Sequence, residues 1–455
     1  MNENDTFSLD IKRMGINGEG IGFYNKLAVF VDGAIPGEVH EVCVTNCSQT
    51  KMAFAKTVEI KRVSKSRKIA ECPYYEACGG CAVMHVKYED MLINKRNILI
   101  EALNRYTSLD TRSFEIKPTV ASSDVFGYRN KSQLPVKRYD NKTSVCMIKA
   151  KSNQLVPVES CMVNNPLINT LNTQILQLVD EIGLQVYLPK FNRGVLKYLV
   201  IRVNKQNEAL VTFICHEKNN KIKELAKKVI ALSGVKGVYE NFNEQIKPGS
   251  LFGKETNLLE GEPYIIETLG KVKYQIYPTT FFQLNTKQAE AMYNVVLKAC
   301  KLSLKERILD AYCGVGAIGL YLAKLAGEVV GIEYNKESVM AAEENAKINK
   351  IKNAKFYQGD ASELLPKMIR DGEVFDIVVA DPPRTGLGEK FINTLLDSEV
   401  KKIIYVSCNP ATLAKDLELL RVKYNVNSIT PVDMFPQTPL VETVALLTLN
   451  PSVKK

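Results

Sequence analysis

The sequence predicts an α/β protein in three parts: a small N-terminal β-barrel, a central α+β domain with a cysteine cluster, and a C-terminal Rossmann-like domain. Residues 1–61 alternate apolar and polar side chains between glycine turns, which is typical of short strands. Residues 62–265 mix helical and strand-like segments and begin with closely spaced cysteines. In residues 266–455, strand-like runs alternate with helical segments, which indicates a parallel sheet covered on both faces.

The composition narrows the class of protein. A hydrophobic content of 45% and a charged content of 24% are ordinary for globular chains and exclude disorder and fibres. No apolar run reaches the roughly 18 residues needed to cross a bilayer, and the first ten residues lack a signal-peptide pattern. We therefore expect a cytoplasmic monomer with no membrane or protein partner. Eleven cysteines in such a compartment favour metal binding or catalysis over disulfides.

The charge pattern favours a nucleic-acid partner. The chain carries a net charge of +10, and seven basic residues against one acid lie between Lys51 and Lys68. Such a segment can follow phosphates, although a solvated surface strand is the alternative. Residues 1–61 also resemble the TRAM domain, an RNA-binding module, through the strings Gly18-Glu19-Gly20-Ile21-Gly22 and Val31-Asp32-Gly33-Ala34-Ile35-Pro36-Gly37-Glu38.

The first strand–helix unit of the C-terminal part predicts a nucleotide pocket. Its strand runs into the turn Gly314-Val315-Gly316, where the backbone can approach a ligand and the first helical amides are free. Glu333 ends the next strand, where a carboxylate can bind both hydroxyls of a ribose. Asp360 closes the third strand, well placed for an adenine edge. Such a pocket suits NAD as well as S-adenosylmethionine.

The fourth strand separates these two cofactors. It ends in Asp381-Pro382-Pro383, and an acid followed by two prolines forms a rigid turn that methyltransferases place beside the methyl group. Nicotinamide enzymes have no need of this turn. Enzymes that methylate the amino groups of bases normally carry an aromatic residue after the prolines, but Arg384 stands here. We therefore expect S-adenosylmethionine as the cofactor and disfavour amine methylation.

Five motifs together resemble the RNA uracil-5-methyltransferase family in order and spacing: Phe281-Phe282-Gln283-Leu284-Asn285, Asp310-Ala311-Tyr312-Cys313-Gly314-Val315-Gly316, Asp381-Pro382-Pro383-Arg384, Val406-Ser407-Cys408-Asn409-Pro410 and Val441-Glu442-Thr443-Val444. With the TRAM-like start and the cysteine cluster, the chain is most similar to the 23S rRNA branch over nearly its whole length. The resemblance implies RNA as the substrate and S-adenosylmethionine contacts at Gln283, Tyr312, Glu333 and Asp381. For Gln283 and Tyr312, ordinary structural hydrogen bonding is the alternative.

The same resemblance assigns a nucleophile and a base. Cys408 ends an apolar run and precedes Asn409-Pro410, so its thiol is displayed at a strand tip; without its neighbours it would be an apolar filler. A thiolate added to uracil C6 gives an enolate whose C5 can attack a sulfonium methyl. The C5 proton must then leave to a base, which the resemblance places at Glu442. Many family members carry histidine two residues earlier, where Leu440 stands here.

The cysteine cluster predicts a metal site. Cys72, Cys78 and Cys81 lie within ten residues, and Cys161 is the candidate fourth ligand. Four thiolates suit zinc or an iron–sulfur cluster, and spacing alone does not separate them. The resemblance implies a [4Fe-4S] cluster with a structural role. Two neighbours, Cys146 and His85, are also possible ligands, but core or surface roles are expected for them, as for Cys300 and Cys313.

Three alternative functions stay open at this point. One is methylation of uracil-54 in tRNA, although enzymes of that type usually lack the TRAM-like start and the cysteine cluster. Another is an RNA-binding protein with an inactive site, which the intact Cys408, Glu442 and Gln283 disfavour. A third is a cytosine-5-methyltransferase, which would usually present Pro-Cys where Ser407 precedes the cysteine here.

Overall fold

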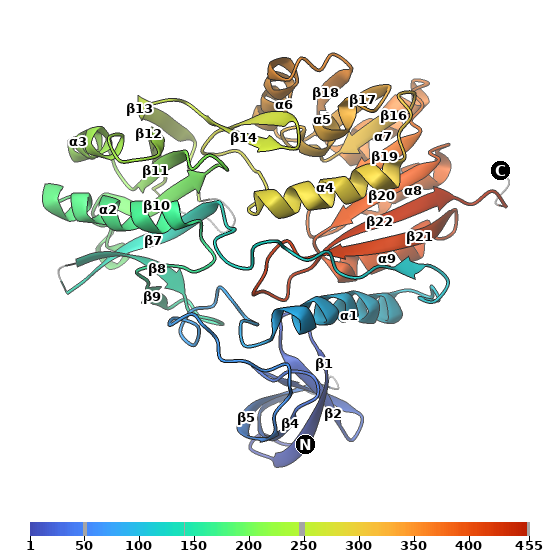
Figure 1. The fold of residues 1–455 in the computed structure, drawn as a ribbon, viewed down its shortest axis with the longest axis horizontal. Helices are drawn as coiled ribbons and strands as arrows, with labels where there is room; N and C mark the ends of the chain where they lie inside the picture. The colour runs from blue at the N-terminus through green and yellow to red at the C-terminus, as the bar shows by residue number, and fades with distance from the viewer. Residues whose placement is uncertain (49–51, 141, 245–250, 453–455) are drawn as a thin grey trace.

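The computed structural model of the chain describes residues 1–48, 52–140, 142–244 and 251–452 and shows three bodies (Figure 1). The N-terminal strands form the blue body at the bottom of the view, a green sheet with two helices lies to the left, and the yellow-to-red sheet with its helices lies to the right. In the described residues no helix is long and apolar enough to span a membrane.

The N-terminal body is a closed barrel with the strand order β1-β2-β3-β5-β4. Its strands are β1 (Thr6–Met14), β2 (Gly20–Tyr24), β3 (Leu27–Val31), β4 (Val39–Ser48) and β5 (Met52–Arg62). Alternating residues such as Leu9, Val29 and Val42 fill its interior. The period-two pattern of the sequence therefore does form a small five-stranded barrel.

The central body is a seven-stranded mixed sheet with the order β13-β12-β11-β10-β7-β8-β9. Its strands are β7 (Lys131–Tyr139), β8 (Lys142–Ile148), β9 (Leu155–Pro157), β10 (Leu196–Val203), β11 (Ala209–Cys215), β12 (Val235–Phe242) and β13 (Glu255–Gly261). Two helices and a short 3-10 turn complete it: α2 (Pro166–Ile182), α3 (Asn220–Val229) and η1 (Pro189–Phe191). The apolar stripes of α2 and α3 pack on the sheet through Ile168, Leu171, Ile222 and Leu225.

The C-terminal body is an eight-stranded sheet with the order β18-β17-β16-β19-β20-β22-β21-β6. Its strands are β16 (Arg307–Ala311), β17 (Glu328–Glu333), β18 (Ala354–Gln358), β19 (Ile377–Ala380), β20 (Lys402–Ser407), β21 (Tyr424–Val432), β22 (Glu442–Leu449) and β6 (Glu115–Ile116). Strands β18 to β20 are parallel, as expected, whereas β22 is antiparallel to both β20 and β21. The predicted parallel sheet is therefore present in β18-β17-β16-β19-β20, and the antiparallel β22, which was not predicted, makes the whole sheet mixed.

Helices cover both faces of this sheet and enclose two apolar cores. One core includes α4 (Thr286–Cys300), α5 (Ala317–Ala323) and α6 (Lys336–Ile348), with the hairpin β14 (Ile265–Leu269) and β15 (Val272–Ile276) beside it. The other includes α7 (Ala361–Arg370), α8 (Glu389–Asp397), α9 (Pro410–Leu420) and α1 (Tyr88–Tyr106). The expected core residues Cys300 and Cys313 are both buried.

Helix α1 connects the barrel to the C-terminal sheet. It packs on α9 and β21 on one side and on β1 on the other, as Figure 1 shows. Strand β6, which follows α1 in the chain, extends the C-terminal sheet by pairing with β21. Part of the 62–265 segment is thus built into the C-terminal body.

Candidate active site

Three neighbouring strands of the C-terminal sheet present predicted site residues at one edge. Ala311 pairs with Ala380 and Ala380 with Tyr405, so the ends of β16, β19 and β20 lie side by side. The residues that follow these ends are Tyr312, Asp381 and, after Ser407, Cys408. Ligands of doubly wound sheets bind beyond these carboxyl ends, so the topology alone brings the three residues to one place.

Cys408 and Glu442 come from adjacent antiparallel strands. Ser407, the last residue of β20, pairs with Thr443, and the Thr443 hydroxyl donates to the Ser407 carbonyl at 3.0 Å. Cys408 therefore leaves β20 at the level where Glu442 begins β22. Glu442 is 7% exposed and Cys408 is half-buried. The thiol and the carboxylate thus stand together at the carboxyl edge of the sheet, between its two inner strands β20 and β22. We call this place the active-site corner, or sheet corner.

Burial makes this corner a site of weakly acidic groups. Burial, with the Asp381 carboxylate adding to it, raises the pKa of Glu442 to about 8, against the opposing charges of Arg384 and Lys95. Burial also raises the pKa of the Cys408 thiol, and Glu442 and Asp381 raise it further. These shifts are typical of groups that exchange protons near neutral pH.

Two further carboxyls, those of Asp310 and Asp381, line a cavity beside this corner. Burial raises the pKa of Asp310 to about 7, although the Gly319 amide donates to it at 2.7 Å, and burial likewise raises the pKa of Asp381 to about 7. Among the described residues no side chain or backbone group hydrogen-bonds the Asp381 carboxylate. A cationic ligand would favour the ionised form of both acids, because it lies close to them in a low-dielectric cavity. This property fits the sulfonium of S-adenosylmethionine.

Gln283 and Tyr312 line the same cavity, together with Asp310, Cys313, Gly314 and Asp381. The Gln283 loop is held by the central sheet: the Asn130 amide donates to the Gln283 carbonyl at 2.9 Å, and the buried Arg202 donates to the carbonyls of Thr280 and Phe282. These bonds hold the backbone of the loop, and the Gln283 side chain lines the cavity. The neighbouring Phe281 is 72% exposed beside it.

Glu333 and Asp360 lie at the same sheet edge but differ in their contacts. Glu333 accepts hydrogen bonds from the amides of Gly314 at 3.0 Å and Asn335 at 2.8 Å, so it joins the glycine turn to the start of α6. Asp360 is exposed and caps α7, accepting from the amide of Ser362 at 2.8 Å. Of the five predicted cofactor contacts, Gln283, Tyr312 and Asp381 share the cavity, whereas these two flank it.

The four predicted metal ligands meet at a second cavity of about 350 Å³. Cys72, Cys78, Cys81 and Cys161 all line it, and Cys146 does so as well. The Gly80 amide points at the Cys78 sulfur at 3.3 Å. Among the described residues, however, no three cysteine, histidine or acidic side chains converge closely enough to hold a metal ion. The four thiols fit a thiolate-bound metal in their chemistry and line one cavity, but they are not arranged around one centre.

His85 lies outside that donor set. It bonds the hydroxyl of Tyr75, and burial lowers its pKa to about 4. We therefore assign it a structural role.

Several basic residues of the segment from Lys51 to Lys68 form ion pairs with acids that lie elsewhere in the fold. Lys61 pairs with Glu41 and Glu59, and Arg67 with the buried Glu38. Two of the remaining predicted residues, Arg62 and Lys68, contact Asp10 and Glu71. Lys51 lies outside the described residues. Fewer of these cations are free to meet phosphate than the sequence count indicates.

The sequence reasoning missed three residues of the active-site corner. Asp310 was detectable as an acid inside the apolar strand β16. Tyr293 on α4 is buried, which raises the pKa of its hydroxyl, and the charges of Asp381, Asp310 and Glu442 raise it further. Lys95 reaches the corner from α1, and nothing in its local sequence indicates this.

Together, the doubly wound sheet, the acid-lined cavity at its carboxyl edge and the thiol beside it define an α/β methyltransferase. The family model described as tRNA (uracil-5-)-methyltransferase matches residues 87–450. The chain therefore belongs to the tRNA (uracil-5-)-methyltransferase family.

Relatives and a solved structure extend this result over nearly the whole chain. An uncharacterized RNA methyltransferase of Listeria monocytogenes is 41% identical over 453 residues, and the alignment covers 98% of this chain and 98% of that protein. An uncharacterized RNA methyltransferase of Bacillus anthracis is 39% identical, with 98% of this chain and 97% of that protein covered. The crystal structure of Pyrococcus abyssi tRNA (uracil-54, C5)-methyltransferase in complex with S-adenosyl-L-homocysteine is 29% identical, with a TM-score of 0.75 over 97% of this chain and 99% of that chain.

Proposed function

We propose that this protein methylates C5 of uracil in RNA, most favourably in 23S rRNA, with S-adenosylmethionine as the methyl donor. The observation that carries the proposal is the register of β20 and β22, which places a thiol and a buried carboxyl at the same sheet corner, beside an acid-lined cavity. That arrangement provides a nucleophile and a base next to a site suited to a sulfonium.

Cys408 and Glu442 divide the chemistry between them. The Cys408 thiolate forms a bond to uracil C6, which places the electron pair on C5 and its enolate oxygen. When bound, S-adenosylmethionine would supply the methyl group that C5 captures; the electron pair of the broken S–CH3 bond stays on sulfur, and S-adenosylhomocysteine is the leaving group. Glu442 then accepts the C5 proton, and the electron pair of that C–H bond re-forms the C5–C6 double bond while the Cys408 sulfur leaves. The raised pKa of Glu442 suits a base that accepts a proton from carbon near neutral pH.

We assign the cofactor contacts to the residues at the cavity and its rim. Gln283, Tyr312 and Asp381 bind from inside the cavity, and Asp381 lies nearest in chain and space to the sheet corner. Glu333 binds the ribose, with its two backbone bonds fixing the direction of its carboxylate. Asp360 lies beside the adenine, in a position set by its cap on α7.

The cysteine cavity is proposed to hold a [4Fe-4S] cluster through Cys72, Cys78, Cys81 and Cys161. The four sulfurs line one cavity, and a backbone amide already points at one of them. A cluster there would tie the 72–81 segment to the 161 region. We further propose that residues 1–61 bind RNA as a TRAM-like barrel, that residues 62–265 hold the cluster and that residues 266–455 carry the chemistry.

The Pyrococcus abyssi structure favours a second candidate, methylation of tRNA uracil-54. That enzyme, described as acting on tRNA, aligns with 97% of this chain, so the alignment must include most of the barrel. Possession of a barrel does not by itself distinguish rRNA from tRNA enzymes. Fold comparison therefore leaves the RNA class to experiment.

A transcript assay tests the proposal. The purified protein is incubated with tritiated-methyl S-adenosylmethionine and either 23S rRNA or unmodified tRNA, and the label is mapped by nuclease digestion. We expect 5-methyluridine in 23S rRNA; label at position 54 of tRNA would establish the second candidate. RNA binding without methyl transfer to either RNA would contradict an enzymatic role and favour an inactive RNA-binding protein.

A further inference from the structure

A nine-residue loop, 433–441, joins β21 to β22 and delivers Glu442 to the active-site corner. Val432 pairs with Glu442 across the neck of this hairpin. Inside the neck lies Lys95 of α1, whose side chain is completely buried. Burying an ammonium group costs free energy unless hydrogen-bond and charge partners compensate for the lost hydration. The partners of Lys95 are therefore informative about its role.

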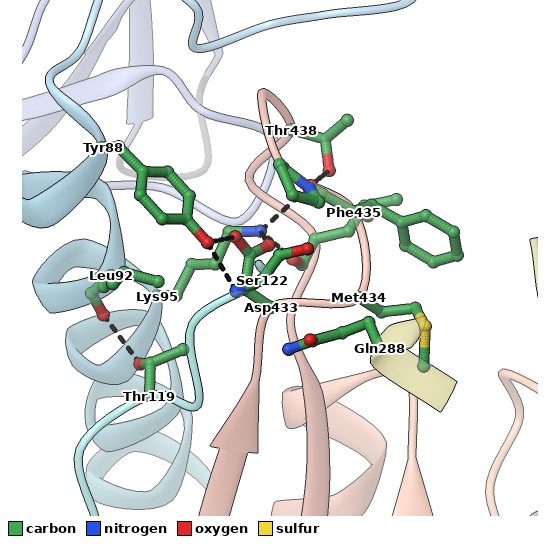
Figure 2. A network of polar contacts seen from close by, with 12 residues as sticks. Tyr88, Leu92, Lys95, Thr119, Ser122, Gln288, Asp433, Met434, Phe435 and Thr438 are labelled. Atoms are coloured by element: carbon green, nitrogen blue, oxygen red, sulfur yellow. Dashed lines mark hydrogen bonds and ion pairs between the residues drawn. The ribbon is translucent and has the colours of Figure 1, made fainter. Parts of the chain in front are cut away.

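Lys95 donates to both ends of the loop. Its ammonium contacts the Asp433 carboxylate at the start of the loop and donates to the carbonyl of Phe435 at 3.1 Å (Figure 2). It also donates to the carbonyl of Leu440, at the end of the loop, at 2.7 Å. Three acceptors match the three N–H groups of a charged ammonium. Leu440 stands two residues before Glu442, so the bond to its carbonyl acts directly on the segment that carries the base.

The partners of Lys95 are themselves fixed. The Tyr88 hydroxyl, about two helical turns earlier on α1, donates to the second Asp433 oxygen at 2.7 Å and accepts from the Ser122 amide at 2.7 Å. Figure 2 shows Tyr88 and Lys95 of α1 pointing at Asp433 from the same helix. The Tyr128 hydroxyl also donates to the Pro436 carbonyl of the loop, and the Val83 amide donates to the Gln437 carbonyl. Hydrogen bonds from α1 and from neighbouring segments therefore hold the loop on both sides of the Lys95 contacts.

We propose that Lys95 is a positioning residue for Glu442: it closes the neck of the 433–441 loop and holds the base against the uracil C5 proton. This inference rests on the proposed function. Lys95 makes no hydrogen bond to Glu442, so it acts through the loop backbone and through its charge. The Leu440 side chain has no polar group, so the loop is bound to Lys95 at this position through the backbone carbonyl.

The charge of Lys95 also acts on the base. The ionisable groups that face Glu442 come from five segments: Lys95 on α1, Tyr293 on α4, Asp381 after β19, Arg384 in the following turn and Cys408 after β20. Lys95 and Arg384 are the cations among them, and both lower the pKa of Glu442. Loss of the Lys95 charge should therefore move the acid limb of the rate profile to higher pH.

The test compares Lys95→Met with the double variant Lys95→Met/Asp433→Asn, which avoids leaving an unpaired buried carboxylate if the single variant folds poorly. Lys197→Met is the matched control, since Lys197 is also buried and donates to two carbonyls, at 2.7 and 2.6 Å, but on β10 of the central sheet. Each protein is given a uridine transcript and a 5-fluorouridine transcript. Turnover, covalent protein–RNA complex and the pH dependence of kcat are measured.

If Lys95 positions the base, both Lys95 variants form the 5-fluorouridine adduct at the wild-type level, because thiol attack and methyl transfer precede proton removal. Turnover of uridine RNA falls about a hundredfold or more, a covalent complex accumulates on ordinary uridine, and the acid limb of kcat moves up in pH. The Lys197→Met control shows none of these changes.

Wild-type turnover in both Lys95 variants would overturn the inference. So would loss of turnover without accumulated complex, because that result places the defect before proton removal. If the wild-type protein forms no 5-fluorouridine adduct, the proposed function itself fails, and this result is distinguishable from the other two.

Discussion

Ser407 and Thr443 form a cross-strand pair in which the Thr443 hydroxyl donates to the Ser407 carbonyl at 3.0 Å. The pair fixes the register of β20 against β22 and so determines which residues emerge beside each other at the sheet corner. Those residues are Cys408 and Glu442. A slip of one residue would turn either side chain to the opposite face of the sheet.

Substitution of the proposed base separates its step from the earlier ones. Glu442→Gln keeps the shape of the side chain but cannot accept the C5 proton, so turnover should fall by about 10²- to 10⁴-fold. The methylated covalent complex should then accumulate on ordinary uridine RNA and be visible as a shifted band in a denaturing gel. A Glu442→Gln protein with near-wild-type turnover would remove this residue from the mechanism.

Activity should rise with pH. Burial raises the pKa of Glu442 to about 8 and also raises that of Cys408, and both groups must lose a proton before they act. The kcat/KM for S-adenosylmethionine, at saturating RNA, should therefore fall at least about tenfold per pH unit below about pH 8. A rate that stays level from about pH 6 to about pH 8 would contradict these shifts.

Glu333 should contribute to cofactor affinity through its charge. In Glu333→Gln one carboxylate oxygen is replaced by an amide group, which cannot accept from the Gly314 amide or from a ribose hydroxyl. A charged hydrogen bond contributes about 1.5–3 kcal/mol, so the Kd for S-adenosylmethionine should rise roughly ten- to hundredfold in calorimetry. The exposed Glu343→Gln on α6 is the control. An unchanged Kd in Glu333→Gln would exclude the ribose contact.

The cysteine cavity can be tested by colour and metal content. Cys78→Ser and Cys161→Ser should each abolish the brown colour and iron content of anaerobically purified protein, since each removes a thiolate ligand. Cys146→Ala should keep both, although Cys146 lines the same cavity. A colourless wild-type protein with equimolar zinc would contradict the iron–sulfur proposal.

The sequence predicted the features that depend on local pattern. A strand before the turn Gly314-Val315-Gly316 and a second strand ending at Glu333 were predicted, and the structure has them as Arg307–Ala311 and Glu328–Glu333. Continuous apolar runs between turns are readable without tertiary information. Residues at strand ends, such as Asp381, could be placed together because parallel strands share one carboxyl edge.

Features that depend on distant pairing were not predictable. Lys95 and Asp433 are 338 residues apart in the chain, and neither lies in a motif that indicates the other. The basic segment looked nearly free of acids because its neutralising partners, such as Glu38 and Glu41, come from β4 and the turn before it. The antiparallel β22 was missed as part of the sheet for the same reason: strand pairing is a property of the fold.

The most direct test of the central claim uses RNA that contains 5-fluorouridine, because fluorine at C5 cannot leave as a proton does and the bond to sulfur persists. We predict a stable protein–RNA complex for the wild-type protein with S-adenosylmethionine, and no complex for Cys408→Ala. Absence of the complex in the wild type, or its undiminished formation in Cys408→Ala, would contradict covalent catalysis by this thiol.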